Sequence, residues 1–589
     1  RQRLFEMPRS SWSDYEQELI SEGGGVYDRS AKSIAVSPQM KKCFDIEVEQ
    51  LTPNALITHL LLARVDLLWN GGIGTYVKGS SESHMEVGDK SNDSLRVNGD
   101  QLRCKVVGEG GNLGMTQLAR GEYGLNGGRI NTDFIDNAGG VDCSDHEVNI
   151  KILLNAVVAR GDLTMKHRNK LLEEMTDSIA ELVLQNNYRQ VQAISLAEFQ
   201  AVLRAGEYRR VISRLEAAGR LDRFLEFLPA DEALVDRRAQ GQGLTRSELS
   251  VLVSYSKAIL KEELIESDLG IDPYLANAVK TAFPSRLVAE YSDEILNHRL
   301  QREIMATQVA NDMVNRMGLN FVLRQRKATG AQVADIARAY TTVMEVYSIP
   351  ALWEEIEALD HKVEVSVQMG MMLDLNRLVR RAVRWMLRNR RYELAPSVAI
   401  PQFGEGVRQL QEALPQMIRG RAAERYEAER ERCIEVGVTP ELAAVVAGSG
   451  QAYTALGIID AARETDAPLE DVAQLYFHMG ERLELDWFSG LIMAAKIDNE
   501  WQALARDSYL EDLEWQQRAL ACGALRHICE KRDMLACLQR WEEQEAPLVQ
   551  RWREMLTELH ATQSPDFAMF AVANRELLDL AQSGSSTHD

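Results

Sequence analysis

The chain has 589 residues, of which 45% are hydrophobic and 26% are charged, and this length predicts three or four globular domains rather than one core. The formal net charge of −21 leaves no general basic surface, so no nucleic acid partner is expected. No apolar run reaches the roughly 18 residues that cross a bilayer. We therefore expect no membrane partner and a cytoplasmic location.

The first quarter of the chain is rich in glycine and alternates short strand-like runs with helical patterns, such as residues 56–63. The strand-like runs are residues 65–69, 102–107 and 129–135. This alternation predicts parallel β/α units, whose functional groups project from the carboxyl ends of the strands. Those ends are residues 70–72, 108–112 and 136–140, and all three are small, polar and loop-like. We predict a partial Rossmann-like parallel sheet.

Beyond residue 145 the pattern becomes long, amphipathic and helical. Helices are expected at residues 147–158, 163–185 and 248–263, the last introduced by a capping box from Thr245 to Glu248. Pro396, Pro401 and the glycines after them indicate a linker. The predicted fold is therefore α/β followed by all-α. Its parts are an α/β domain at 1–160, a helical domain at 161–395, a linker at 396–406, a second helical domain at 407–582 and a disordered tail at 583–589.

The segment GEGGNLG at residues 108–114 follows a strand-like run and approaches the dinucleotide-binding fingerprint. The fingerprint requires its third glycine at position 113, where Leu113 stands. A glycine-rich turn of this kind lets the backbone approach a ligand closely, but by itself it is more often plain turn chemistry.

Residues 137–145 place an amide, a flexible turn and a hydroxyl group just before a predicted helix. In the structural interpretation, Ser144 is the N-cap of that helix and Glu147 completes its capping box. The same position suits a carboxylate ligand, because a helix N-terminus offers unpaired N–H donors. The two interpretations are compatible.

Cys143 and His146 have the spacing of a pair of metal ligands, but no second Cys/His pair accompanies them, so no metal site is expected. The seven cysteines contain no Cys-x-x-Cys pair and indicate reduced thiols. A basic stretch at residues 377–391, with Trp385 inside it, is interpreted as a solvated helical face paired with acidic neighbours.

Three segments, taken in order, resemble the second half of the coenzyme domain of glutamate dehydrogenases, members of the amino-acid dehydrogenase superfamily. They are VDLLWNGGIG at 65–74, VVGEGGN at 106–112 and NAGGVDCS at 137–144. The second resembles the family's Ala-Glu-Gly-Ala-Asn segment and the third its Asn-Ala-Gly-Gly-Val-x-x-Ser segment. The longer sequence segments at residues 66–78, 88–93 and 144–151 are similar to those of the large NAD-specific bacterial subclass.

The resemblance implies NAD as cofactor and the oxidative deamination of L-glutamate to 2-oxoglutarate and ammonium. It implies that Asn112 contacts the nicotinamide ribose, that Asn137 lies near the nicotinamide, and that Ser144 helps to hold the side-chain carboxylate of the substrate. The candidate cofactor-binding residues are Asn70, Gly71, Gly72, Gly110, Asn112, Asn137 and Gly139. Residues 1–160 would then be the second half of the NAD-binding domain.

The resemblance also implies what is missing. In the family, the catalytic lysines and aspartate and the glycine fingerprint for the pyrophosphate lie in earlier segments, and no counterpart occurs here. The sequence also begins with Arg1 rather than Met. We therefore expect a fragment that is inactive alone, with its catalytic residues unknown.

The helical region from about residue 160 carries no recognisable chemistry and is interpreted as scaffold, interdomain brace or subunit contact, with a homo-oligomer expected. The main alternative is a non-enzymatic helical oligomerisation or regulatory module with a degenerate nucleotide-binding fold. A third hypothesis is another NAD-linked amino-acid dehydrogenase, for which a hydrophobic residue in place of Ser144 would be expected.

Overall fold

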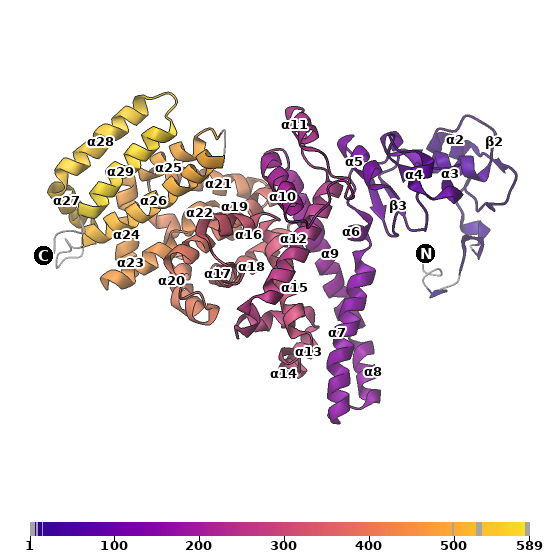
Figure 1. The fold of residues 1–589 in the computed structure, drawn as a ribbon, viewed down its shortest axis with the longest axis horizontal. Helices are drawn as coiled ribbons and strands as arrows, with labels where there is room; N and C mark the ends of the chain where they lie inside the picture. The colour runs from indigo at the N-terminus through magenta and orange to yellow at the C-terminus, as the bar shows by residue number, and fades with distance from the viewer. Residues whose placement is uncertain (1–5, 8–9, 15, 498–499, 526–532, 584–589) are drawn as a thin grey trace. The chain divides into compact units, whose positions relative to one another are not determined.

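The computed structural model describes residues 6–7, 10–14, 16–497, 500–525 and 533–583 (Figure 1). The chain divides into two compact units. Unit 1 comprises Arg1–Glu262 and Asn277–Asn320, and unit 2 comprises Glu263–Ala276 and Phe321–Asp589. The division differs from the one expected at residue 160, because a single helix runs from the α/β part to Arg160 and packs against the next long helix.

The strands of unit 1 form three pairs. Strands β3 (Leu67–Asn70) and β6 (Val106–Glu109) are parallel, as are β4 (Val77–Lys78) and β5 (Val97–Asn98), whereas β1 (Ile34–Ala35) and β2 (Gln50–Leu51) are antiparallel. A single bridge between Val77 and Met115 ties the β4 strand to the loop that follows β6. The main core of this part contains Val77, Val97, Cys104, Val107, Met115, Ala119, Tyr123 and Ile130. The coarse prediction of an α/β part followed by helices is confirmed.

The strand predicted at residues 129–135 is wrong. Only Arg129 makes a bridge, to Val106, and residues Asp133–Asp136 form the short helix α6. A short apolar run is compatible with the periodicity of a strand and with that of a helix. Here the carboxylates of Asp133 and Asp136 are used to bind loop amides rather than to flank a strand.

Unit 1 also contains helices in addition to α6. They are α2 (Pro38–Phe44), α3 (Pro53–Leu61), α4 (His84–Val87), α5 (Gln117–Leu125), α7 (Ala138–Arg160), α8 (Met165–Glu174), α9 (Thr176–Phe199), α10 (Ala205–Ala217), α11 (Asp231–Ala239), α13 (Ser285–Glu290), α14 (Ser292–Leu296) and α15 (Gln301–Met317), with the 3-10 helices η1 (Trp12–Asp14), η2 (Gln17–Leu19), η3 (Lys90–Asn92) and η4 (Gly99–Gln101). Helices α12 (Arg246–Glu266) and η6 (Leu275–Ala282) contain residues of both units.

Local signals in the sequence placed some helix starts correctly. The capping box before α12 is present: the Thr245 N–H donates to Glu248 Oε2 at 2.7 Å, and the Glu248 N–H donates to Thr245 Oγ1 at 3.4 Å. The helix expected at 163–185 is two helices, α8 and α9, with a break at Met175.

Unit 2 is helical throughout the part that the structure describes. Its helices are α16 (Phe321–Thr329), α17 (Val333–Val346), α18 (Ile349–Glu357), α19 (Val365–Asn389), α20 (Pro396–Met417), α21 (Gly420–Glu435), α22 (Pro440–Ala452), α23 (Ala455–Thr465), α24 (Leu469–Arg482), α25 (Leu485–Ala494), α26 (Glu500–Leu525), α27 (Met534–Gln544), α28 (Ala546–Ala561) and α29 (Phe567–Ser583), with the 3-10 helix η5 (Asp268–Ile271). Within the described ranges no single helix is long and apolar enough to cross a membrane, although α22 and α23, bent by 60° at their junction, pass together by length and composition.

The linker predicted at residues 396–406 is wrong, because these residues form the first half of α20. Pro396 occupies the first turn, where no backbone N–H is needed. Ala399, Phe403 and Val407 are buried at helical spacing, so packing outweighs the cost of Pro401 inside the helix. Of the tail expected at 583–589, Ser583 ends α29, and residues 584–589 lie outside the described part.

Candidate cofactor site

The parallel pairing of β3 and β6 places the two loops that follow these strands side by side. Asn70 is in register with Glu109, and the Gly110 N–H donates to the Asn70 carbonyl at 2.9 Å. A Cβ atom at Gly111 would lie 3.0 Å from the Gly72 carbonyl oxygen. The loop 70–74 and the loop 109–115 are therefore in direct contact, as the two strand-end segments predicted.

The Asn70 side chain points into this contact. Its Oδ1 accepts a long hydrogen bond, 3.5 Å, from the Gly72 N–H. Its Nδ2 is buried and has no acceptor among the residues that the structure describes. A Cβ at Gly114 would lie 1.6 Å from that Nδ2, so glycine at 114 makes room for the amide. A buried donor without a partner is one that a polar ligand at this site would satisfy.

Gly110 has a structural role that the sequence did not indicate. A Cβ at Gly108 or Gly110 would lie 2.7 Å or 2.5 Å from atoms of the Trp69 ring. The spacing of these two glycines therefore accommodates Trp69, which is itself 60% exposed. Gly71 and Gly72 differ, because both are exposed and a Cβ at Gly72 would meet no atom within 4 Å. Their backbone is open to a ligand.

Two of the candidate amides meet directly: Asn137 Nδ2 donates to Asn112 Oδ1. Asn137 is the N-cap of α7, so the loop expected at residues 136–140 is instead the end of α6 and the start of α7. Gly139 lies in the first turn of α7, where a Cβ would be 3.6 Å from Val183 of α9, an ordinary packing distance. The structure thus brings Asn70, Gly72, Gly110, Asn112 and Asn137 into one contiguous group.

The N-cap interpretation of Ser144 is wrong. Ser144 lies in the second turn of α7 and its Oγ donates to the Gly140 carbonyl at 2.9 Å. The helix begins earlier because the glycines at 139 and 140 adopt helical backbone instead of a loop. Ser144 is exposed, so its hydroxyl group is accessible to a ligand.

Cys143 is exposed, whereas His146 is buried, and its Nδ1 is 2.9 Å from the Ala282 carbonyl oxygen. That contact gives His146 a packing role within unit 1. Within the described ranges, no group of three or more His, Cys, Asp or Glu side chains is arranged to hold a metal ion.

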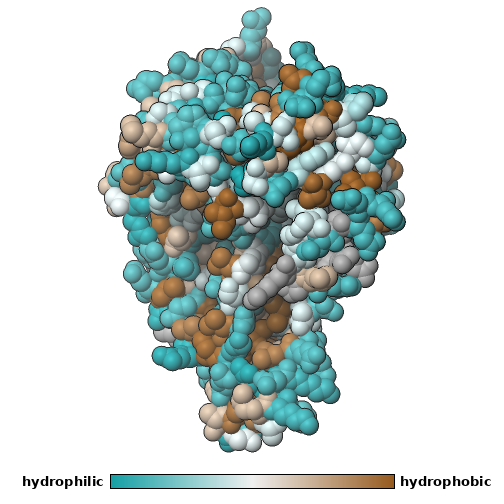
Figure 2. Space-filling view, turned by 90° about the vertical axis from the view of Figure 1, so that its right-hand side faces the viewer, coloured by the Kyte–Doolittle hydropathy of each residue, from teal (hydrophilic) through white to brown (hydrophobic). Residues whose placement is uncertain are grey.

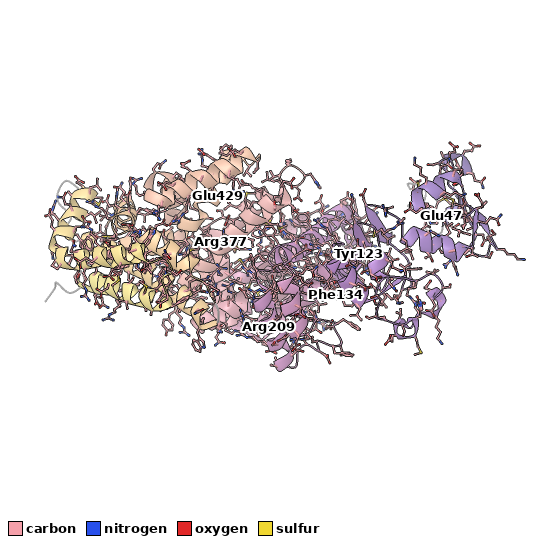
Figure 3. All side chains as sticks on the ribbon, turned by 90° about the horizontal axis from the view of Figure 1, so that it is seen from above. Glu47, Tyr123, Phe134, Arg209, Arg377 and Glu429 are labelled. Carbon is pink, nitrogen blue, oxygen red and sulfur yellow. The ribbon has the colours of Figure 1, made fainter. Side chains whose placement is uncertain are left out.

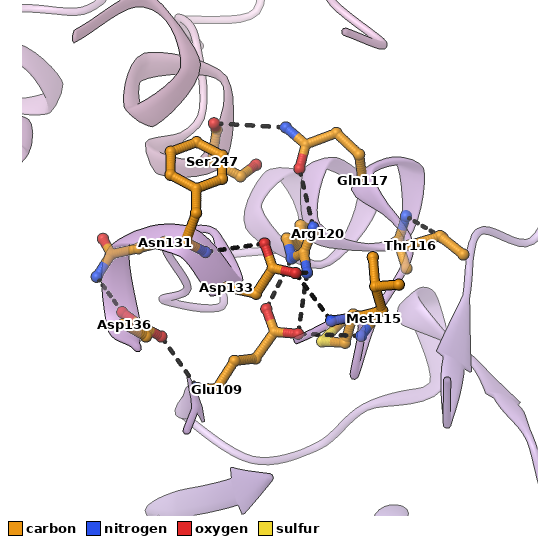
Figure 4. Close-up of polar contacts among 12 residues, drawn as sticks. Glu109, Met115, Thr116, Gln117, Arg120, Asn131, Asp133, Asp136 and Ser247 are labelled. Carbon is orange, nitrogen blue, oxygen red and sulfur yellow. Dashed lines mark hydrogen bonds and ion pairs between the residues drawn. The ribbon is translucent and has the colours of Figure 1, made fainter. Parts of the chain in front are cut away.

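A buried ion cluster lies beneath the loop 109–115 (Figure 4). Arg120, on α5, donates from Nε to Glu109 Oε2 at 2.7 Å and from Nη2 to Glu109 Oε1 at 3.0 Å. Asp133 Oδ2 is 3.4 Å from the same Nη2. Burial raises the pKa of Glu109, and the hydrogen bonds and charge of Arg120 oppose that rise. The two-pronged geometry is the strong form of this ion pair.

The carboxylates of the cluster hold the loop backbone. Glu109 Oε1 accepts from the Met115 N–H at 3.0 Å, Asp133 Oδ2 from the Leu113 N–H at 2.8 Å, and Asp136 Oδ2 from the Glu109 N–H at 3.1 Å. Leu113 has φ = 61°, the left-handed conformation that glycine adopts most easily. At the position of the fingerprint's third glycine, Asp133 accepts the Leu113 N–H and so stabilises this backbone.

This cluster was not predicted from the sequence. Glu109 was visible inside the glycine motif, and a buried carboxylate requires a cation. The sequence did not identify that cation, because Arg120 lies eleven positions further along the chain and only folding brings its guanidinium group to Glu109.

The motif GDKSND at residues 88–93 holds the backbone at Thr75, directly after the loop 70–74. Asp89 accepts hydrogen bonds from the Thr75 N–H at 2.9 Å, from Asn92 Nδ2 at 2.6 Å and from Ser91 Oγ at 2.6 Å. These bonds, with a smaller contribution from the charge of Arg96, lower the pKa of Asp89 to about 2. The motif therefore has a structural role next to the candidate site.

Replacing Asp89 with asparagine is expected to destabilise unit 1 in a pH-dependent way. The unfolded pKa of Asp is about 3.9 and the folded pKa is about 2, so the stabilisation is fully present above about pH 4 and is lost as the pH falls toward 2. Urea unfolding from pH 7 to pH 2 should show the difference between wild type and Asp89→Asn shrinking in that window. A difference that does not vary with pH would contradict the role of the charge.

The sequence of the chain matches two known protein families. Residues 1–197 match the family described as "Bacterial NAD-glutamate dehydrogenase, catalytic domain". Residues 241–579 match the family described as "Glutamate dehydrogenase, C-terminal". The chain belongs to the glutamate dehydrogenase family. The resemblance drawn from the three strand-end segments is confirmed at this level.

Three curated relatives are each named NAD-specific glutamate dehydrogenase. The chain is 53% identical over 583 residues to the NAD-specific glutamate dehydrogenase of Pseudomonas aeruginosa, covering 99% of this chain and 36% of that protein. It is 52% identical over 585 residues to that of Halomonas elongata, with the same coverage. It is 37% identical over 593 residues to that of Mycobacterium tuberculosis, covering 98% of this chain and 36% of the relative. The chain thus spans about a third of the length of these members of the glutamate dehydrogenase family.

Proposed function

We propose that this chain supplies the nicotinamide side of the cofactor site in an NAD-dependent glutamate dehydrogenase. The reaction converts L-glutamate, NAD and water to 2-oxoglutarate, ammonium, NADH and a proton. The observation that carries the proposal is the contiguous group of loop amides and exposed glycines after β3 and β6, in a chain whose relatives are named NAD-specific glutamate dehydrogenases.

The residues present fit a polar, planar ligand. The bond from Asn137 fixes the oxygen of the Asn112 amide and leaves the Asn112 Nδ2 as a donor for the ribose. Asn70 Nδ2 is a second donor, and Gly71 and Gly72 allow close approach of the ligand to the backbone. NAD, when bound, accepts the hydride from the α-carbon of glutamate. The loops orient the nicotinamide and, held by the buried carboxylates, need little rearrangement to do so.

The rest of the site is proposed to lie outside this chain. One face of the β3–β6 pair is apolar and exposed: Leu67 is 55%, Trp69 60% and Val106 38% exposed. Figure 2 shows hydrophobic patches on a surface that is otherwise largely hydrophilic. We propose that further parts of the cofactor domain cover this face and bring the catalytic lysines and aspartate, so that this chain alone turns over no glutamate. The partial Rossmann-like parallel sheet, a homo-oligomer and a cytoplasmic location remain predictions.

Ser144 is proposed to hold the distal carboxylate of the substrate, for which its Oγ must turn from the Gly140 carbonyl. In a complete gene product that contains this chain, Ser144→Ala is expected to raise the KM for L-glutamate roughly tenfold, the value of one hydrogen bond to a charged group. The KM for NAD should not change, and Ser144→Thr, which keeps the hydroxyl group, should restore most of the affinity. Steady-state kinetics measure both constants. An unchanged KM for glutamate in Ser144→Ala would remove Ser144 from the site.

The broader test of the proposed function is NADH formation from L-glutamate, with L-aspartate and L-leucine as control substrates. A complete gene product that forms NADH with glutamate alone supports a glutamate dehydrogenase. Activity with leucine instead would favour another amino-acid dehydrogenase. No activity with any of the three would favour the helical oligomerisation or regulatory module.

A further inference from the structure

Unit 2 contains a large cavity, far larger than gaps between packed helices require. Its volume is about 1340 Å³, and its walls are formed by α19, α21, α24, α25 and α26, with parts of α22 and α23. Typical small-molecule sites have volumes of about 300–1,000 Å³. The proposed dehydrogenase site lies in unit 1 and uses none of these residues.

The walls of the cavity are rich in charge of both signs, with a positive excess. Eleven arginines and nine acidic residues line it, a formal net charge of +2 within a chain of net charge −21. Five of the arginines come from α19, namely Arg377, Arg380, Arg381, Arg384 and Arg388. Figure 3 shows Arg377 and, on α21, Glu429 in the same part of the helical unit. A site of this composition favours an anionic ligand.

The basic stretch at residues 377–391 was predicted to be a solvated helical face paired with acidic neighbours. The pairing is confirmed for part of it: Arg384 Nη1 is 2.8 Å from Glu511 Oε1 and 3.2 Å from Asp507 Oδ2, and Arg388 pairs with the same Glu511. The solvated face is confirmed only in part: Arg377 and Arg388 are 59% and 43% exposed, whereas Arg384 is only 12% exposed and lines the cavity. Trp385, inside the stretch, is buried.

Arg381 is held differently from its neighbours. Its guanidinium carbon lies 3.4 Å from the centre of the Tyr453 ring, a stacking contact that fixes the plane of the group. A planar, stacked guanidinium is arranged in advance to bind a carboxylate or phosphate with two hydrogen bonds. Tyr453 is itself buried in the cavity wall.

Glu514 lies near Arg381 in the same wall. Its Oε1 is buried and has no hydrogen-bond partner in the described part of the chain. Burial raises the pKa of Glu514 to about 7; Arg381 and Arg518 oppose the rise, and Glu511 adds to it. Three buried tyrosines, Tyr347, Tyr453 and Tyr476, also face it. Near neutral pH both the neutral and the ionised form of Glu514 are therefore populated, and when Glu514 is neutral the charge of Arg381 is available to a ligand.

We propose that this cavity binds a small, multiply charged organic anion, a polycarboxylate or a phosphate ester, through Arg381, and that ionised Glu514 opposes the binding. The stacked guanidinium supplies the recognition and the positive excess of the walls attracts the ligand. The volume admits a molecule of metabolite size together with water. Protonation of Glu514 removes a negative charge that lies near Arg381 and would repel the anion.

The test is calorimetric titration of this chain with citrate and, separately, with fructose 1,6-bisphosphate, against acetate at matched ionic strength. At least one of the two should bind with one-to-one stoichiometry at pH 6. Binding of citrate indicates a carboxylate site, and binding of fructose 1,6-bisphosphate indicates a phosphate site. Arg381→Met should weaken binding at least roughly tenfold, the value of a lost charge-assisted contact. Arg408→Met is the matched control, because Arg408 is an exposed arginine on α20 outside the cavity.

Glu514→Gln provides a second and independent test. At pH 6 it should bind like wild type, because wild-type Glu514 is then mostly protonated. At pH 8.5 it should bind on the order of tenfold more tightly than wild type, and comparison at one pH cancels the titration of the ligand itself. If circular dichroism shows that Arg381→Met does not fold, the comparison of Glu514→Gln with wild type tests the proposal on its own. The proposal is overturned if neither anion binds better than acetate, or if folded Arg381→Met and Glu514→Gln both bind like wild type.

Discussion

Replacing Arg120 with methionine is expected to lower the free energy of unfolding of unit 1 by about 3–5 kcal/mol, the range for breaking one side of a buried ion pair. The side chains of Arg120 and Glu109 are 5% and 0% exposed, so removing the guanidinium leaves Glu109 buried beside Asp133 without its cation. The expected loss corresponds to a fall in the unfolding temperature on the order of 10 °C. Urea and thermal unfolding of the chain measure the change.

Two further variants separate the buried pair from arginine loss in general. Arg408→Met removes an exposed arginine from α20 and should cost less than about 0.5 kcal/mol. Adding Glu109→Gln to Arg120→Met should recover much of the lost stability, because the uncompensated charge is then gone. Equal destabilisation by Arg120→Met and Arg408→Met would show that the cluster does not stabilise the loop.

Gly114→Ala is expected to weaken NADH binding by a complete gene product about 10- to 100-fold, the value of one or two lost hydrogen bonds. A Cβ at this position would lie 1.6 Å from Asn70 Nδ2 and 3.0 Å from Glu109 Oε1. Asn70 must then leave the site, since Glu109 is fixed by Arg120. Fluorescence titration with NADH gives the dissociation constant.

Gly140→Ala is the matched control for Gly114→Ala. It makes the same chemical change nearby, in helix α7, where a Cβ would meet no atom within 4 Å. It should leave the NADH dissociation constant unchanged and stabilise the helix by about 0.5–1 kcal/mol. An unchanged dissociation constant in Gly114→Ala as well would remove Asn70 from the cofactor site.

Local sequence signals predicted the parts of the site that depend on neighbouring residues. The strand-like runs before Asn70 and Glu109 indicated two parallel strand ends, and their loops do meet. The capping box of Thr245 and Glu248 could be predicted because the two residues are three positions apart in the sequence. The family resemblance implied that Asn112 and Asn137 both lie near the nicotinamide end of the cofactor. Their direct contact is seen only in the structure.

The features that failed depend on contacts between distant residues. Residues 129–135 resemble a strand, but Asp133 and Asp136 bind the loop of β6 and favour a helical turn. Pro401 resembles a linker signal, but the buried side chains around it retain the helix. The role of Arg120 is set by its contact with Glu109, eleven positions earlier in the chain. The cavity in unit 2 forms where α21, α24, α25 and α26 assemble around the arginines of α19.

Whether these loops hold the cofactor is tested most directly by the rate of NADH formation from L-glutamate, in a complete gene product that contains this chain and in its Asn112→Ala variant. We expect the wild type to form NADH with glutamate and not with L-aspartate or L-leucine. The variant, folded by circular dichroism, should lose roughly tenfold or more in kcat/KM for NAD. Wild type that forms no NADH from glutamate, or a variant as active as wild type, would contradict the proposed site.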